Sequence, residues 1–338
     1  MVASRPDSKK TQHIACFLLS TTVYCGNRVK KPGHSFHLSH RGLSMEKESI
    51  KALVKMLGPI AWLALAAGLQ MLGALLFFRA PADLILIFTY ALITFSVYLL
   101  NRFTDNEDGY NYPEQRMFFQ QKSKLIILPI FLMAFTTFIL AITGRLVIWH
   151  IIMITCGISY SVSLIPFMPN KSFRFVRFKD IFFVKNIVVS LLWGISPFAL
   201  ASSQKGAIIP TINELIVVIA AFCITSFINT TSCDVRDIAG DRQLGLLTLP
   251  TRLGEKFTVL FLLLIGFAGC LFVGINYYLG NVSRPAILLF VANMVWTGFV
   301  AAPIYMKKNK LPKIISEPLI DSQFVMNGIS LIVLSRFL

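Results

Sequence analysis

Long apolar segments separated by short polar ones dominate the sequence from residue 56 to residue 338. A helix needs about 20 apolar residues to cross a hydrocarbon core about 30 Å thick. Nine segments reach or approach this length: 56–78, 84–100, 125–142, 147–167, 182–200, 215–232, 257–279, 286–306 and 319–338. Backbone groups in lipid must be hydrogen-bonded within the chain, and these segments lack the alternation of barrel strands. We therefore expect nine transmembrane helices.

The composition supports this interpretation. Of the 338 residues, 55% are hydrophobic and 14% are charged, whereas a soluble globular protein has about 25% charged residues. We therefore expect an all-α, multi-pass integral membrane protein whose main solvent is the lipid bilayer. The second and sixth predicted helices both end in acidic segments, 101–108 and 234–241. This weak repeat suggests two four-helix halves followed by a ninth helix.

A formal net charge of +16 raises the question of a nucleic-acid partner. The basic residues instead follow the predicted topology. With a cytoplasmic N-terminus, the inner segments hold twenty-one Lys and Arg residues, in 41–55, 102–124, 171–185, 236–256 and 307–313. The outer segments hold five: Arg79, Arg145, Lys205, Arg284 and Arg336. The positive-inside rule predicts a cytoplasmic N-terminus and an external C-terminus, and we expect no nucleic-acid partner.

Residues 1–44 differ from the rest, because they are basic and rich in Ser and Thr, with Asp7 as their only acid. Such a segment is expected to be disordered. It has the composition of an organellar transit peptide, or it is an extension upstream of a true start at Met45. We expect the membrane domain to be 45–338. Its location would be the cell inner membrane, or an organellar membrane if the leader is a transit peptide.

Two acidic motifs follow predicted helices on the same side of the membrane. In the first, Asn101, Asp105 and Asp108 are spaced i, i+4, i+7, and they share one face if the helix continues that far. In the second, Asp234, Asp237 and Asp241 are spaced i, i+3, i+7. Such acids would be ordinary solvated helix ends if nearby arginines balanced them. Two such motifs on one side make that interpretation less favourable.

Clustered carboxylates at the end of an apolar helix repel one another and favour a bound cation. Mg²⁺ prefers hard oxygen ligands, and it is commonly held by one or two carboxylates plus substrate phosphates. The motifs therefore predict magnesium bridging a diphosphate. The expected metal ligands are Asp105, Asp108, Asp234, Asp237 and Asp241.

The segment 234–254 resembles the DxxDxxxDxxxGxxTLPxxLG pattern of the UbiA superfamily of intramembrane prenyltransferases, and it matches at Asp237, Asp241, Gly245, 248–250 and 253–254. The first motif is looser, because many members have an acid where this chain has Arg102. The residues Asn111, Pro113 and Arg116 look like the family's NxPxR segment. The resemblance spans roughly residue 45 to the C-terminus.

The resemblance implies magnesium-dependent transfer of a prenyl group from a polyprenyl diphosphate to an aromatic or lipid acceptor, with release of diphosphate. It assigns catalysis to Asp105, Asp237 and Asp241, and substrate binding to Asn101, Arg116, Tyr160, Lys179, Lys185 and Asn186. The acceptor stays open. A terpene cyclase of the same superfamily and a cation transporter are the alternatives; CDP-alcohol phosphotransferases are disfavoured, because no Ala-Arg pair follows Gly109.

Overall fold

The computed structural model of the protein describes residues 38–105, 125–168, 173–307 and 313–337. The predicted site residues Asp108 and Arg116 lie outside this part of the chain. The chain divides into two compact units, Met1–Glu48 and Ser49–Leu338. The second unit contains the site residues discussed below.

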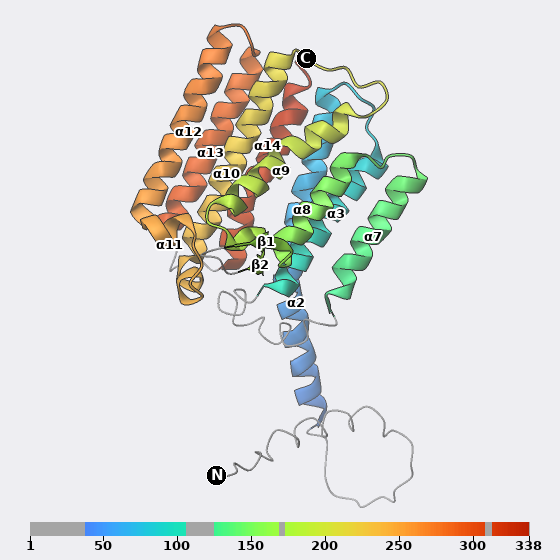
Figure 1. The fold of residues 1–338 in the computed structure, drawn as a ribbon, viewed down its shortest axis with the longest axis vertical. Helices are drawn as coiled ribbons and strands as arrows, with labels where there is room; N and C mark the ends of the chain where they lie inside the picture. Colours follow the sequence, from blue (N-terminus) through green and yellow to red (C-terminus); the bar gives the residue numbers. More distant parts are fainter. Residues whose placement is uncertain (1–37, 106–124, 169–172, 308–312, 338) are drawn as a thin grey trace, which may run out of the picture. The chain divides into compact units, whose positions relative to one another are not determined.

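Helices account for nearly all of the described secondary structure (Figure 1). They are α2 Leu38–Phe77, α3 Leu84–Thr104, α7 Ile127–Ile142, α8 Ile148–Ser161, α9 Val184–Ser202, α10 Ile212–Gln243, α11 Leu249–Leu253, α12 Glu255–Tyr278, α13 Arg284–Lys307 and α14 Lys313–Leu334. Between α8 and α9, strands β1 Ile165–Phe167 and β2 Arg174–Val176 pair antiparallel, and the 3₁₀ helix η3 Phe178–Asp180 follows.

Each predicted apolar segment falls on one of these helices. Within the described residues, five helices are long and apolar enough to cross a membrane: Val54–Phe77, Leu84–Thr104, Val184–Ser202, Ile212–Gln243 and Glu255–Tyr278. Shorter apolar helices occupy Ile127–Ile142, Ile148–Ser161 and Arg284–Thr297. The chain thus has the all-α fold of a membrane protein.

The predicted helix over 147–167 was too long. Helix α8 ends at Ser161, and Val162 already has extended backbone angles, φ −119° and ψ 141°. Pro166 has no N–H to donate and restricts the residue before it to extended conformations, so the chain enters strand β1 instead. Hydropathy alone cannot detect this end, because Val162, Leu164 and Ile165 are as apolar as the helix.

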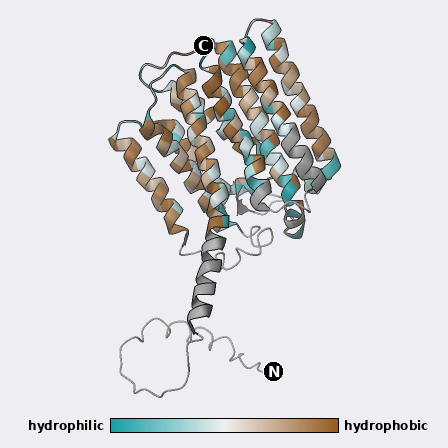
Figure 2. Ribbon diagram, turned by 180° about the vertical axis from the view of Figure 1, so that it is seen from behind, coloured by the Kyte–Doolittle hydropathy of each residue, from teal (hydrophilic) through white to brown (hydrophobic). Residues whose placement is uncertain are grey.

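Helix α10 is the centre of the second unit, since it packs against α9, α12, α13 and α14, while α3 packs against α7 and α8. Phe77, Phe198, Phe222 and Phe324 belong to the main buried cluster. Large apolar side chains on α7 and α12 point outward, and Figure 2 shows these helices as mostly hydrophobic along their length. Outward apolar faces are expected of helices that contact lipid.

Small and polar residues set the close contacts between helices, as is common in membrane bundles. A Cβ added at Gly194 of α9 would lie 2.3 Å from Cys223 Sγ of α10, so the two helices cross at the glycine. Helix α14 is held by side-chain amides, with Gln70 Nε2 donating to Phe324 O at 3.0 Å and Asn229 Nδ2 donating to Ile320 O at 2.6 Å. These bonds fix the rotation of α14.

Candidate active site

A cavity of about 250 Å³ lies among helices α2, α3, α8, α9, α10 and α14. One part of its wall is polar and charged: Asn101, Arg102, Asp105, Tyr160, Lys185, Asn186, Asn229, Thr230, Asp234, Arg236, Asp237, Asp241, Glu317 and Asp321. The remaining wall is largely apolar: Pro59, Ile60, Leu63, Val97, Val188, Val189, Leu192, Trp193 and Phe324. The cavity therefore offers separate surroundings for a charged group and for a hydrocarbon chain.

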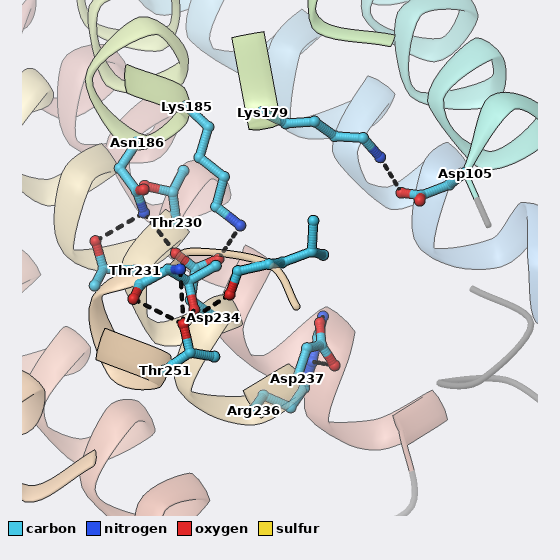
Figure 3. A network of polar contacts seen from close by, with 12 residues as sticks. Asp105, Lys179, Lys185, Asn186, Thr230, Thr231, Asp234, Arg236, Asp237 and Thr251 are labelled. Atoms are coloured by element: carbon cyan, nitrogen blue, oxygen red, sulfur yellow. Dashed lines mark hydrogen bonds and ion pairs between the residues drawn. The ribbon is translucent and has the colours of Figure 1, made fainter. Parts of the chain in front are cut away.

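The second acidic motif lies on one continuous helix, as predicted, because α10 extends to Gln243. Lys185 Nζ lies 2.5 Å from Asp234 Oδ1, and Asn186 Nδ2 donates to Asp234 Oδ2 at 2.9 Å. Asn186 also donates to Thr231 Oγ1 at 3.1 Å. Figure 3 shows Lys185 and Asn186, both from the start of α9, directed at the same carboxylate. Asp234 is thus held between two helices.

The other acids of α10 differ in their surroundings. Arg236 donates two hydrogen bonds to the Asp237 carboxylate, from Nη2 to Oδ2 at 2.5 Å and from Nε to Oδ1 at 3.1 Å. Arg236 also lies 3.8 Å from Glu317 of α14. Asp241, one turn further along, is 4% exposed and lines the same cavity. All three acids of the motif therefore face one space.

The first acidic motif is not continuous in the structure. Helix α3 ends at Thr104, and Asp105 has extended backbone angles, φ −82° and ψ 125°. Asp108 was predicted to share a face with Asn101 and Asp105 if the helix continued that far, and this condition is not met, because α3 ends before Asp105. The residues that follow Asp105 include Asn106, Gly109 and Pro113, which favour turns over helix.

Lys179 of η3 reaches the end of α3. Its Nζ lies 2.5 Å from Asp105 Oδ2 (Figure 3). It also lies 3.4 Å from Asn101 Oδ1. Phe183 separates Lys179 from Lys185, and it adopts the left-handed backbone region with φ 69°. The left-handed backbone at Phe183 changes the chain direction between the two lysines, so that Lys179 contacts Asp105 at the end of α3 and Lys185 contacts Asp234 of α10.

The loop that presents Lys179 has its own ion pair. Arg177 Nη2 lies 2.6 Å from Asp180 Oδ1, and the Arg177 backbone N–H donates to Asp180 Oδ2 at 3.0 Å. Burial raises the pKa of Asp180, but the hydrogen bonds and charge of Arg177 outweigh it, so the pKa lies below its ordinary value. The ion pair and hydrogen bonds between Arg177 and Asp180 stabilise the turn around Lys179.

The donor chemistry of the cavity fits a divalent cation that is shared with a ligand. Within the described ranges, no group of three or more His, Cys, Asp or Glu side chains is close enough to form a metal cage alone. Oxygens of Asp105 and Asp234 each lie 2.5 Å from an ammonium nitrogen, so both already accommodate positive charge. Mg²⁺ commonly combines a few carboxylate oxygens with substrate phosphates, and these oxygens suit that role.

Several cavity residues were not singled out as site residues from the sequence. Glu317 and Asp321 of α14, Arg102 of α3 and Arg236 of α10 extend the charged wall, and Trp193 forms part of the apolar wall. Asp321 had a detectable sequence feature, since an acid inside a predicted span is unusual. The cavity role of Trp193 had none, because tryptophan in such a helix is equally typical of the core or of the membrane interface.

The all-helical fold and the acid-lined cavity define the class of intramembrane prenyltransferases. A family model for VviA prenyltransferase matches residues 92–282, which is more than half of the chain. The chain belongs to this prenyltransferase family, and with it to the UbiA superfamily. The protein is thus an enzyme of the prenyltransferase type. No curated protein matches the sequence.

Solved structures share the fold of this chain. A UbiA homologue from Archaeoglobus fulgidus bound to GPP and Mg²⁺ is 17% identical, with a TM-score of 0.55 over 83% of this chain and 99% of that one. A digeranylgeranylglyceryl phosphate synthase structure is 16% identical, with a TM-score of 0.54 over 86% and 100%. The apo UbiA homologue from Aeropyrum pernix K1 is 16% identical, with a TM-score of 0.51 over 82% and 98%.

Proposed function

We propose that the protein transfers a prenyl group from a magnesium-bound polyprenyl diphosphate to an acceptor and releases diphosphate. The observation that supports this most directly is the two-part cavity, in which four motif aspartates lie at a charged wall and an apolar wall adjoins them. The charged wall suits a metal-bound diphosphate, and the apolar wall suits a hydrocarbon chain. Structures of UbiA homologues bound to GPP or DMAPP with Mg²⁺ are consistent with such a substrate.

Asp105, Asp234, Asp237 and Asp241 would hold Mg²⁺, together with Asp108, which lies outside the described residues. When bound, the ion supplies charge neutralisation for the departing diphosphate. Asn101 Oδ1 accepts a hydrogen bond from Lys179 Nζ, the partner of Asp105, and Asn186 Nδ2 donates directly to Asp234 Oδ2. They therefore orient the carboxylate environment rather than donate charge to it.

Lys179 and Lys185 provide positive charge at two separate motif carboxylates, Asp105 and Asp234. Each ammonium group lies 2.5 Å from a motif carboxylate in the ligand-free protein. A bound diphosphate brings further oxygens, and an ammonium group can donate to a carboxylate and a phosphate oxygen at once. In this proposal the lysines stabilise the negative charge that grows on the leaving group, which is the main electrostatic demand of the reaction.

The apolar wall binds the prenyl chain and excludes water. Ile60 and Leu63 of α2 face Leu192 and Trp193 of α9 across this part of the cavity wall. Loss of diphosphate leaves an allylic carbocation, which water would quench, and a dry pocket protects it until the acceptor attacks. Tyr160 and Arg116 complete the substrate-binding set in the proposal; Tyr160 lines the cavity from α8.

The membrane topology that accompanies this function is nine spans with a cytoplasmic N-terminus. Under this topology the charged end of the cavity opens toward the cytoplasm, where soluble diphosphates are released. A reporter fused after Lys310 should then be cytoplasmic, and one fused at the C-terminus should be external. Equal locations for both fusions would disprove nine spans.

The test of the proposed function is a product assay on membranes that contain the protein. Labelled prenyl diphosphates of several lengths are incubated with hydroxybenzoate, dihydroxynaphthoate, homogentisate and glycerol phosphate lipids, in Mg²⁺ or EDTA. We expect a prenylated acceptor and free diphosphate in Mg²⁺ and neither in EDTA. A cyclic hydrocarbon without acceptor would indicate a cyclase, and aspartate-dependent ion flux without prenyl consumption would indicate a transporter.

A further inference from the structure

Helix α14 contributes a distinct face to the cavity. Glu317, Asp321 and Phe324 line it at spacing i, i+4, i+7, so they form one stripe along the helix. The stripe runs from the charged wall, where Arg102 Nη2 donates to Glu317 Oε1 at 3.1 Å, to the apolar wall, where Phe324 stacks on Trp193 with ring centroids 4.0 Å apart. Asp321 occupies the position between them.

Asp321 is a buried acid that no described residue contacts by a hydrogen bond or an ion pair. Asp321 is 9% exposed, and it lines the cavity. In the part of the chain that the structure describes, no hydrogen bond or ion pair reaches its carboxylate. The guanidinium groups of Arg236 and Arg102 contribute attraction, but they contact Asp237 and Glu317 directly. A buried carboxylate that is left in this state destabilises the fold.

Tyr98 brings a hydroxyl group to the cavity that Asp321 lines. Tyr98 lines the same wall and interacts electrostatically with Asp321. Trp193 Nε1 donates to Tyr98 Oη at 3.1 Å, so the tyrosine oxygen accepts one bond while its own proton is left to donate. An acceptor carboxylate and a donor hydroxyl thus line the same cavity.

We propose that Asp321 binds the prenyl acceptor by accepting a hydrogen bond from its hydroxyl or amine group. This inference rests on the proposed function, and it names a subsite and a substrate class within it. The acceptor donates to the Asp321 carboxylate, and its ring or chain lies toward Trp193 and Phe324. An anionic group is excluded from this position, because Asp321 and Glu317 would repel it. The acceptor therefore presents a neutral O–H or N–H donor here.

The first test is the stability of the purified, ligand-free protein in detergent. A residue retained for binding is commonly a cost to stability, so Asp321→Asn should raise the melting temperature. Glu317→Gln, one turn away, should lower it, because that change breaks the ion pair with Arg102. Ile329→Val, on the exposed side of α14 and outside the cavity lining, is the control and should change little. A lowered melting temperature for Asp321→Asn would make Asp321 a structural residue and overturn the inference.

The second test is kinetic, with hydroquinone and 1,4-dihydroxynaphthalene each assayed beside its dimethyl ether, and with a glycerol lipid. We expect transfer to hydroxyl acceptors only. Asp321→Leu should raise the acceptor KM by at least about tenfold, as loss of a hydrogen bond to a charged group predicts. The prenyl diphosphate KM should stay within about twofold. Asp321→Asn keeps one accepting oxygen and should recover part of the loss.

The outcomes separate this inference from the proposed function. Wild-type membranes that release no diphosphate from any prenyl diphosphate would disprove the function itself. Wild-type transfer with an unchanged acceptor KM in Asp321→Leu would overturn only the acceptor subsite. Equal transfer to the hydroxyl compounds and their ethers would do the same.

Discussion

The two acidic motifs of the cavity are built in different ways. On α10, Asp234, Asp237 and Asp241 lie on one uninterrupted helix that ends at Gln243. On α3, the helix ends at Thr104, and Asp105 is the first residue beyond it. One motif is a continuous stripe; of the other, the described part of the chain contains one carboxylate, at a helix end.

The residues that bond to the two motifs differ too, since one set lies on a packed helix and the other on a short turn. Asp234 is bonded by Lys185 and Asn186 of the adjoining helix α9, so its position follows from helix packing. Asp105 is bonded by Lys179 of the short η3 turn. We infer that α10 and α9 preform half of the diphosphate site, and that the α3 side adjusts when substrate binds, because loop-borne contacts rearrange more easily than packed helices.

The largest effect is expected from removal of a motif charge. Asp237→Asn and Asp105→Asn are nearly isosteric, so insertion should be preserved, but each removes a charge that Mg²⁺ requires. Prenyl transfer should fall by at least about a hundredfold, or about 2.7 kcal/mol. Product formation at the Mg²⁺ concentration that just saturates the wild-type protein measures it. If the α3 side adjusts, raised Mg²⁺ should partly restore Asp105→Asn and not Asp237→Asn.

A charge change outside both motifs is the control for these variants. Lys122→Gln lies in the polar segment after the first motif and should cost much less. Near-normal, EDTA-sensitive activity in both aspartate variants would contradict the metal assignment. Equal losses in all three variants would indicate a general surface-charge effect instead.

The sequence predicted the rigid half better than the adjustable half. The i, i+3, i+7 spacing of the acids on α10 is enough to place them on one face, because residues so spaced lie on the same side of an α-helix. The end of α3 depends on the competition between helix propensity and the turn-forming residues after Asp105. The spacing of Asn101 and Asp105 suits either outcome.

Contacts between distant segments were the part that sequence reasoning could not supply. Lys179 and Lys185 were both expected in the site, but nothing in their spacing shows that a left-handed Phe183 directs them to different helices. The acids of α14 are about 80 residues from the second motif, and only the packing of α14 on α10 brings Glu317 within 3.8 Å of Arg236. Such pairings are set by tertiary packing, which a single sequence does not reveal.

The next effect tests whether α9 and α10 form the rigid frame. Gly194→Ala places a methyl group 2.3 Å from Cys223 Sγ and 2.9 Å from its backbone N, so the helices must separate. Overpacking of this kind costs about 1–3 kcal/mol. Thermal unfolding in detergent should show the loss, and transfer activity should fall with it because Lys185 and Asp234 move apart. Gly274→Ala, which meets nothing within 4 Å, should be silent in both assays.

A smaller effect distinguishes the two lysines. Lys185→Met and Lys179→Met should each reduce transfer by about tenfold, or about 1.4 kcal/mol, since each removes one charged donor to the diphosphate. Each also removes the ammonium partner of a buried carboxylate, so the melting temperature should drop. The double variant Lys179→Met with Asp105→Asn should recover stability but not activity. Recovery of activity would show that the pair is structural.

The smallest effect is expected at the opposite end of α3. Asp83 caps the helix by accepting from the Ile85 and Leu86 N–H groups at 3.0 Å and 3.2 Å, and Arg145 Nε lies 2.5 Å from its other oxygen. Burial raises the pKa of Asp83, but the Arg145 hydrogen bond and the two backbone bonds outweigh it, so the pKa lies below its ordinary value of 3.8. Asp83→Asn keeps a good capping residue and loses only the charge, so it should cost less than about 1 kcal/mol of stability.

Because the folded pKa of Asp83 is depressed, the stabilising contribution of its charge is present above pH 3.8 and is lost as the pH falls through the folded pKa. The difference in melting temperature between wild type and Asp83→Asn should therefore be constant from pH 7 to about pH 5 and shrink toward pH 3. Transfer activity at pH 7 should stay within about twofold. A large activity loss would mean that the position of Asp105 depends on the far end of α3, and the first motif would then be as rigid as the second.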